Sequence, residues 1–306
     1  MNTELLEVLN RYSIQDAGEL TSGNIFFVDS GADGTLDDAD GEHGKSWLYP
    51  FATIDFAVGQ CTDSAGDIIY VAAGHAETLA AAAGIDLDII GITIIGMGRG
   101  ALRPTITLGT DAATVDIDVD AAEITVKNII FKVAAVDVTV MIDVNADGFT
   151  LEDCEINMNV ASFEAVTGVD INGGANGADR TTIRNCTFLA TIAAGSSRGI
   201  ELGEAEDRVI IEGCTVIGDF SDACIHNITG KLCTNLVIKD CLLKNDNAGE
   251  HAIELVEACT GMLVRNMYHT NAAATAVDPG SCYSFECYGI DAADESAFVR
   301  PAVGTP

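Results

Sequence analysis

An eight-residue phrase that returns six times constrains this chain more than any other feature of its sequence. In each copy an apolar third residue is followed by a polar residue, then by Asn, Asp or Gly, and then by Cys or another apolar residue. This alternation is typical of a strand with one buried face. The copies begin 25, 32, 28, 27 and 26 residues apart and are Ile124–Phe131, Phe149–Ile156, Thr181–Phe188, Val209–Val216, Leu236–Leu243 and Met262–His269.

A second phrase, apolar–acid–apolar, alternates with the first. Two interleaved strand phrases of one period indicate a coil that returns to the same place about every 27 residues. No helical phrase recurs, and no proline lies between residues 105 and 278, where it would interrupt a stack of strands. We therefore predict an all-β fold, a right-handed parallel β-helix solenoid with a short N-terminal helical cap. The central residues of the second phrase are Asp118, Asp143, Asp170, Glu201, His226, Glu254 and Asp278.

Stacking of the first phrase predicts two structural ladders. Small, soft thiols suit a narrow core, so we expect an inward column of Cys154, Cys186, Cys214 and Cys241, replaced by Ile129 and Met267 at its ends. A metal–thiolate column is the alternative, but no His alternates with these cysteines. Cys233 and Cys259 suggest another ladder, and Cys282 and Cys287 could form a disulfide. Residue types that tolerate left-handed turns fill the fifth position: Asn128, Asp153, Asn185, Gly213, Asp240 and Asn266.

The segments outside the coils should close the ends of the solenoid. Residues 51–61 have the apolar spacing of a helix, with Thr53 as its N-cap. A helix over Thr3–Tyr12 could cap, self-associate or dock to another protein. After residue 279 the pattern breaks, and Phe285, Tyr288 and Phe298 should cover the last coil. The predicted divisions are an N-terminal helix or attachment segment (1–23), a lead-in and cap segment (24–75), the β-helix (76–280) and a C-terminal cap or tail (281–306).

The N-terminal part carries a further pattern in Phe27–Asp29, Pro50–Ile54, Gly66–Gly74, Ile92–Gly96 and Pro104–Ile106. It resembles the first coils of pectate-lyase-like β-helix proteins, and with the repeats the resemblance spans residues 24–280. Such a resemblance implies the fold. It leaves the activity open, because this superfamily includes polysaccharide lyases, hydrolases, phage tailspikes and non-catalytic surface proteins. It also implies a homo-oligomer, usually a trimer.

The acids of the second phrase should project from one face as an acidic stripe. Three interpretations remain open: a solvated polar face, a ladder that binds calcium or other counter-ions, and a catalytic acid pair. The calcium ladder would use Asp118, Asp143, Asp170, Glu201 and Glu254, and the acid pair would come from Asp170, Glu201 and Glu254. Against catalysis, the stripe is nearly uniform, and only Arg198 lies near it in sequence to handle an acidic sugar.

The loop over residues 29–41 is a second place where calcium could bind, through Asp33, Asp38 and Asp40. Leu36 stands where an EF-hand frame needs its first ligand, so an ordinary acidic turn is the favoured interpretation. No cofactor is required by any other motif.

Charge narrows the function further. The chain has 47 acids against 15 Lys and Arg, a formal net charge of −32, which opposes binding to nucleic acids or anionic membranes. No apolar run is long enough to insert into a membrane, and residues 1–12 lack the features of a secretory signal. We therefore expect the protein to be located in a virion or on an extracellular surface, and to reach it without the secretory signal route.

These observations favour a non-enzymatic extracellular structural or binding protein. A phage virion component, as a capsid decoration or tail-associated protein, fits best, with other virion proteins, further copies of itself or a glycan as partners. One alternative is a polysaccharide lyase or glycoside hydrolase, tailspike-like or secreted, that uses carboxylates of the stripe. The other is a calcium-binding adhesin module.

Overall fold

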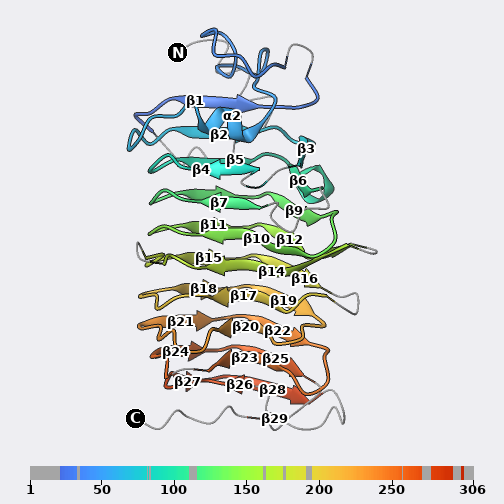
Figure 1. Ribbon diagram of the computed structural model, residues 1–306, viewed down its shortest axis with the longest axis vertical. Coiled ribbons are helices and arrows are strands. Elements are labelled where there is room, and N and C mark those ends of the chain that lie inside the picture. Colours follow the sequence, from blue (N-terminus) through green and yellow to red (C-terminus); the bar gives the residue numbers. More distant parts are fainter. Residues whose placement is uncertain are drawn as a thin grey trace.

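Three parallel sheets wind together into one solenoid in the computed structural model (Figure 1). Each coil contributes one strand to sheet 1, then one to sheet 2 and one to sheet 3, and successive strands in a sheet run parallel. The predicted parallel β-helix is confirmed. The structure describes residues 21–299 apart from 33–34, 81, 83, 110–115, 161–162, 175–176, 191–194, 257, 271–276 and 292–297. The predicted helix over Thr3–Tyr12 and the candidate ligand Asp33 therefore lie outside the described residues.

The strands are short, and each sheet extends along almost the whole solenoid. Sheet 1 contains β1 (Ile25–Val28), β2 (Ile68–Val71), β5 (Thr93–Gly96), β8 (Thr125–Lys127), β11 (Thr150–Glu152), β15 (Thr182–Arg184), β18 (Ile210–Glu212), β21 (Leu236–Lys239), β24 (Gly261–Val264) and β27 (Tyr283–Phe285). Sheet 2 contains β3 (Ala76–Leu79), β6 (Thr105–Leu108), β9 (Ile130–Val133), β12 (Glu155–Asn157), β16 (Thr187–Ala190), β19 (Thr215–Gly218), β22 (Leu242–Asn245), β25 (Met267–Thr270), β28 (Tyr288–Asp291) and the antiparallel β29 (Phe298–Val299). Sheet 3 contains β4 (Ile85–Leu87), β7 (Ile117–Val119), β10 (Val138–Val144), β14 (Phe163–Ile171), β17 (Arg198–Leu202), β20 (Ala223–Asn227), β23 (His251–Leu255) and β26 (Val277–Asp278), with β13 (Asn159–Val160) antiparallel to β14.

Inward side chains stack in columns and form the core. One column in sheet 1 places each apolar residue directly above the next at the strand spacing of ~4.8 Å. A slip of one residue would turn such a column toward water, so burial fixes the register. The members of this column are Val126, Leu151, Ile183, Ile211, Ile238 and Leu263, and all are buried.

A left-handed residue turns the chain from sheet 1 into sheet 2. The following residue points inward, and where it is Cys its thiol donates to two carbonyls: that of Cys186 contacts Arg184 O at 3.3 Å and Leu151 O at 3.5 Å. The Cys column therefore fills the corner between sheets 1 and 2, and its thiols also contact backbone carbonyls there. The left-handed residues, with φ between 51° and 64°, are Asn128, Asp153, Asn185, Gly213, Asp240, Arg265 and Glu286.

The prediction for the sixth copy of the phrase was wrong by one residue. Leu263 pairs with Ile238, which puts Arg265 rather than Asn266 in the left-handed position. Asn266 takes the place of the cysteine: its Oδ1 accepts from Cys241 N at 3.0 Å and its Nδ2 donates to Ile238 O at 2.8 Å. Met267 is not part of the ladder, because it pairs with Leu242 on the outer face of sheet 2 and is exposed.

All ten cysteines are free thiols. Cys287 follows the left-handed Glu286 and donates to Leu263 O at 3.3 Å, so it continues the first Cys column. Cys282 donates to Cys259 O at 3.4 Å, and Cys259 Sγ accepts from Cys233 N at 3.3 Å. The cysteines near the C-terminus therefore extend two ladders and do not pair with each other.

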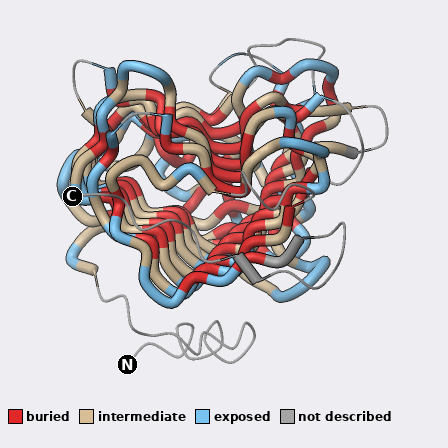
Figure 2. The backbone as a smooth tube through the Cα atoms, turned by 90° about the horizontal axis from the view of Figure 1, so that it is seen from below, coloured by how far each residue is buried: buried red, intermediate tan, exposed pale blue. Residues whose placement is uncertain are grey.

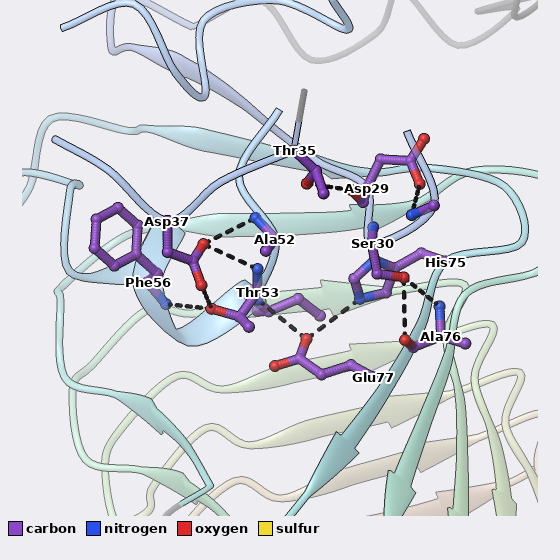
Figure 3. A network of polar contacts seen from close by, with 12 residues as sticks. Asp29, Ser30, Thr35, Asp37, Ala52, Thr53, Phe56, His75, Ala76 and Glu77 are labelled. Carbon is purple, nitrogen blue, oxygen red and sulfur yellow. Dashed lines mark hydrogen bonds and ion pairs between the residues drawn. The ribbon is translucent and has the colours of Figure 1, made fainter. Parts of the chain in front are cut away.

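The N-terminal end is closed by the short helix α2 (Ile54–Val58) and a polar network beside it (Figure 3). Thr53 is the N-cap as predicted, and its hydroxyl accepts from Phe56 N. The carboxylate of Asp37 accepts from the backbone of Ala52 at 2.8 Å and from the Thr53 hydroxyl at 2.9 Å. Asp37 thus holds the lead-in loop against the helix.

Buried His75 fastens the same loop to sheet 2. Its Nδ1 accepts from Ser30 N at 3.0 Å, and its Nε2 donates to Glu77 at 3.2 Å (Figure 3). Asp38 is exposed, and Asp40 accepts from the backbone of Glu42 and His43 at 2.8 and 3.0 Å. These two candidate calcium ligands therefore lie in a surface turn.

The C-terminal prediction needs a correction. The pattern does not break at Pro279, because β27 and β28 add another coil in register with β24 and β25. Phe285 and Tyr288 point outward and are 59% and 48% exposed, so they do not cover the last coil.

The described part of the chain contains no helix of the length and apolarity that a membrane span would need.

Candidate functional site

The acidic stripe runs along sheet 3 as predicted. Each member pairs in register with its neighbour on the next strand, and the column begins one rung earlier than expected, with Asp86 on β4. In order, the column is Asp86, Asp118, Asp143, Asp170, Glu201, His226, Glu254 and Asp278.

The stripe is deepest at its middle. Asp170 and Glu201 are 9% and 4% exposed, whereas Asp278 at the end is exposed. Four consecutive residues of β14 (168–171) and of β17 (199–202) are buried, so the outer face is covered there as well as the inner one. Seen along the axis, buried segments form the inside of the coils and exposed segments lie mostly at the turns (Figure 2). We call the outer face of sheet 3 from Asp86 to Glu254 the sheet 3 recess, because its middle members Asp170 and Glu201 are buried.

Several charged side chains converge on Glu201. Arg198 reaches its Oε2 at 3.0 Å and bridges to Asp222 at 2.7 Å. Thr167 donates to the same carboxylate at 3.5 Å, and His226 Nδ1 lies 3.6 Å from Glu201 Oε1. A guanidinium and a threonine hydroxyl thus both place hydrogen-bond donors against the Glu201 carboxylate.

A second pair of contacts continues the cluster toward the C-terminus. His226 Nε2 lies 3.8 Å from Glu254 Oε2, and His251 Nδ1 lies 3.9 Å from the same oxygen. Both imidazoles therefore face the carboxylate of Glu254.

Asp170 has the opposite environment. Burial, together with the charges of Glu201 and Asp143, raises the pKa of Asp170 to about 8. Its Oδ1 lies where a side chain at Gly203 would be, so the acid rests against bare backbone. Neighbouring rungs thus hold a carboxyl that stays protonated at neutral pH and a carboxylate paired with Arg198.

The N-terminal rungs are also perturbed. Burial and then the charges of Asp116 and Asp120 raise the pKa of Asp118 to about 7, and burial raises the pKa of Asp143 and Asp86. Beside them, Asp63, Asp88, Asp120 and Asp147 line a shallow acidic pocket. Among the described residues, no three His, Cys, Asp or Glu side chains are grouped so that they could hold one metal ion. Calcium binding by the stripe, and by Asp38 and Asp40, stays a prediction.

Polar atoms without a partner gather in the sheet 3 recess. Such atoms are expensive to bury, so a cluster of them on one face needs an explanation. Seven side-chain atoms on strands of sheet 3 are buried and have no hydrogen-bond partner within the described chain: Asp86 Oδ1, Asp143 Oδ1, Asp170 Oδ1, Arg198 Nε, Glu201 Oε1, His226 Nδ1 and His251 Nδ1.

The sequence pattern located the column but missed part of the cluster. His251 and Asp222 were not singled out, and Arg198 was expected only to lie nearby. The signal was present, because Arg198 stands three residues before Glu201, and His251 three before Glu254. Strand pairing then aligns Arg198 with Ala223, and Ala223 with His251.

Structural comparison decides the fold family. A rhamnogalacturonan lyase superimposes with a TM-score of 0.59 at 13% identity, over 91% of this chain and 78% of the lyase. Pectate lyase Pel9A gives 0.56 at 13% identity, over 89% and 78% of the two chains.

This chain has the pectate-lyase-like parallel β-helix fold. A lacto-N-biosidase of family GH136 from Eubacterium ramulus shares this fold too, with a TM-score of 0.53 at 12% identity, over 94% of this chain and 63% of that one. No family model and no curated protein matches the sequence. The superpositions establish the pectate-lyase-like fold. At 12–13% identity they do not establish the chemistry, which has to be argued from the residues of this chain.

Proposed function

We propose that the sheet 3 recess binds a neutral glycan, and that the chain is a non-catalytic binding protein of a virion or another extracellular surface. The observation that carries this proposal is the cluster of partly exposed polar side chains around Glu201, which are Arg198, Asp222, His226 and Glu254. A carbohydrate offers hydroxyl groups that both donate and accept, so it could satisfy carboxylate oxygens, an imidazole and a guanidinium together.

The charge of the site selects the kind of sugar. Acidic rungs continue on both sides of Arg198, and the whole chain carries a net charge of −32. Pectin-like polyanions would be repelled by this face, whereas an uncharged oligosaccharide would not. The two lyases named above share their fold with this chain, and their activity is not carried over to it.

Glycoside hydrolysis is a second candidate function, favoured by one pair of neighbouring carboxyl groups. Asp170 and Glu201 face each other across adjacent rungs, ~5 Å apart, which is close to the carboxyl separation of retaining glycosidases. Asp170 would protonate the leaving oxygen, because its pKa of about 8 keeps the proton at neutral pH. Glu201, which is ion-paired with Arg198, would attack the anomeric carbon.

Two isosteric variants separate binding from hydrolysis. Glu201→Gln removes a charged acceptor and the ion pair with Arg198, so we expect at least roughly tenfold weaker binding to neutral oligosaccharides on a glycan array. Asp170→Asn keeps a neutral side chain of the same shape, so binding should survive. If the chain is a hydrolase, Asp170→Asn should lower product release by about 10²–10⁴-fold.

The matched control is Asp278→Asn, an exposed member of the same column. This variant should bind and react as the unsubstituted protein does. Absence of binding to every neutral glycan, or equal binding by Glu201→Gln, would reject the recess as a glycan site. Binding without product release would leave the non-catalytic proposal and exclude the hydrolase.

A further inference from the structure

The polar groups of the sheet 3 recess repeat along the solenoid axis. From Asp86 to Glu254 each strand adds one acid or imidazole in register with the next, at the strand spacing of ~4.8 Å. Along a strand the same group is flanked by two buried residues, as Asp170 is by Val169 and Ile171. A ligand can therefore meet many members of the column only if it lies along the axis.

Polar surface continues on both sides of the two buried acids. Within the recess, the members of the column before Asp170 and after Glu201 are only partly buried. Beside the N-terminal rungs lies a pocket of about 400 Å³ whose lining includes Asp88, Asp120 and Asn145. Each of these three stands two residues after a member of the column. The recess thus offers contacts well beyond the cluster around Glu201.

The two halves of the recess offer different hydrogen-bonding groups. In the C-terminal half, Arg198 contacts Glu201 at 3.0 Å and His251 lies 3.9 Å from Glu254, so donors stand beside acceptors. The column in the N-terminal half consists of acids. A sugar hydroxyl both donates and accepts, so successive sugars of one chain can contact both halves. A polyamine, by contrast, would meet the guanidinium of Arg198 with like charge.

We infer that the ligand of the sheet 3 recess is a linear neutral glycan that lies along the solenoid axis. The inference rests on the proposed function and specifies the class of glycan. Successive sugars of an extended pyranose chain are spaced similarly to successive strands, so each sugar can place its hydroxyl groups against one rung. At about one sugar per rung, a disaccharide contacts about two rungs, whereas a longer chain contacts the column from Asp86 to Glu254.

Calorimetric titration with oligosaccharides of increasing length tests the inference. The probes are cello-, manno-, xylo- and malto-oligosaccharides from the disaccharide to the octasaccharide, with a length series of any other linear neutral glycan that binds on the glycan array. In the series that binds, affinity should rise with each added sugar until the rungs are filled. The hexasaccharide should bind at least roughly 100-fold more tightly than the disaccharide, because its sugars bind as linked units.

Two variants at distant rungs test the direction of the chain. Asp118→Ala and Glu254→Ala each remove a partly exposed polar group, which is compatible with the fold. Each variant should bind the octasaccharide at least roughly fivefold more weakly, and the disaccharide should be affected by at most one of them. The matched control is Glu212→Ala on the outer face of sheet 1, which should leave the dependence on chain length unchanged.

Two outcomes would overturn the axial glycan and leave the recess as a glycan site. One is equal affinity for the disaccharide and the longer chains, or binding confined to branched glycans of the array. The other is weakening by Glu254→Ala alone at every length, with no effect of Asp118→Ala, which would confine the ligand to the C-terminal rungs. Absence of binding to every neutral glycan would instead reject the recess itself, and the axial glycan with it.

Discussion

Asp170 and Glu201 occupy the same position on adjacent strands, yet their surroundings give them different chemistry. Glu201 forms an ion pair with Arg198 and accepts a hydrogen bond from Thr167. Asp170 has no hydrogen-bond partner on Oδ1 and lies beside the Glu201 charge, so burial raises its pKa to about 8. At the scale of single residues, the surroundings of each rung decide what the stripe can do.

The raised pKa of Asp170 predicts how stability depends on pH. Its folded-state pKa of about 8 exceeds the ordinary value of 3.8, so the folded chain binds a proton that the unfolded chain releases. The stabilising contribution is complete below about pH 4 and is lost as the pH rises toward 8. Asp118, with a pKa of about 7, acts in the same direction. The free energy of unfolding should therefore fall between pH 4 and 8.

Asp170→Asn tests this linkage because it removes the titration and keeps the shape. Thermal melts at steps between pH 4 and 9 should show a shallower decline in the melting temperature for this variant than for the unsubstituted chain, and a higher melting temperature above pH 8. Asp278→Asn, on an exposed rung, should keep the original slope. Parallel curves for Asp170→Asn and the unsubstituted chain would contradict the assigned pKa.

The sequence predicts residue identities on a rung better than it predicts their burial. The register of the stripe follows from the repeat, since every member pairs with the next. The burial of Asp170 and Glu201 depends on the segments that join sheet 2 to sheet 3, which differ in length from coil to coil and do not repeat. The repeated apolar–acid–apolar phrase therefore gave no indication that the middle acids of the stripe are more buried than the acid at its C-terminal end.

At the scale of elements, columns of stacked apolar side chains hold the short strands together. A strand such as β18 has only three residues, and its stability comes from stacking on β15 and β21. Sequence analysis placed the strands of the repeat correctly until the sixth copy, where Asn266 fitted the left-handed position by residue type. The structure instead uses its amide in place of a thiol, because that amide reaches both Cys241 N and Ile238 O.

Adjacent residues of β18 provide a matched test of the columns. Ile211 is fully buried and pairs with Ile183 and Ile238, whereas Ile210 is only partly buried. Ile211→Ala should destabilise the chain by about 2–5 kcal/mol, because it leaves a cavity in the core. Ile210→Ala should cost less than about 1 kcal/mol. Denaturant unfolding of both variants checks this order. Equal losses of unfolding free energy would contradict the assignment of Ile211 to the core and Ile210 to the outer face of β18.

At the scale of the whole molecule, charge is distributed unevenly around the solenoid. Sheet 1 alternates its charges between rungs, with Glu152 reaching Lys127 at 3.3 Å and Arg184 at 2.9 Å. Sheet 3 instead stacks acids from Asp86 to Glu201 without a base in the column. Charges are therefore balanced along this column of sheet 1 and concentrated in acids along sheet 3.

The end-on view shows buried residues on the inside of the coils and exposed residues mostly at the turns (Figure 2). The core is narrow and continuous, so outward positions are free to vary from coil to coil without disturbing it. The same architecture supports lyases and a lacto-N-biosidase at 12–13% identity, which is consistent with function residing in outward residues.

Carboxyl footprinting tests the central claim about the sheet 3 recess most directly. Carbodiimide labelling, read by mass spectrometry, compares the chain alone with the chain saturated by the neutral oligosaccharide that binds it most tightly. The account predicts that labelling falls at Asp222 and Glu254, the partly exposed acids around Glu201, and is unchanged at Asp278 and Asp246. Protection confined to other faces, or unchanged labelling throughout, would contradict the assignment of the recess as the glycan site.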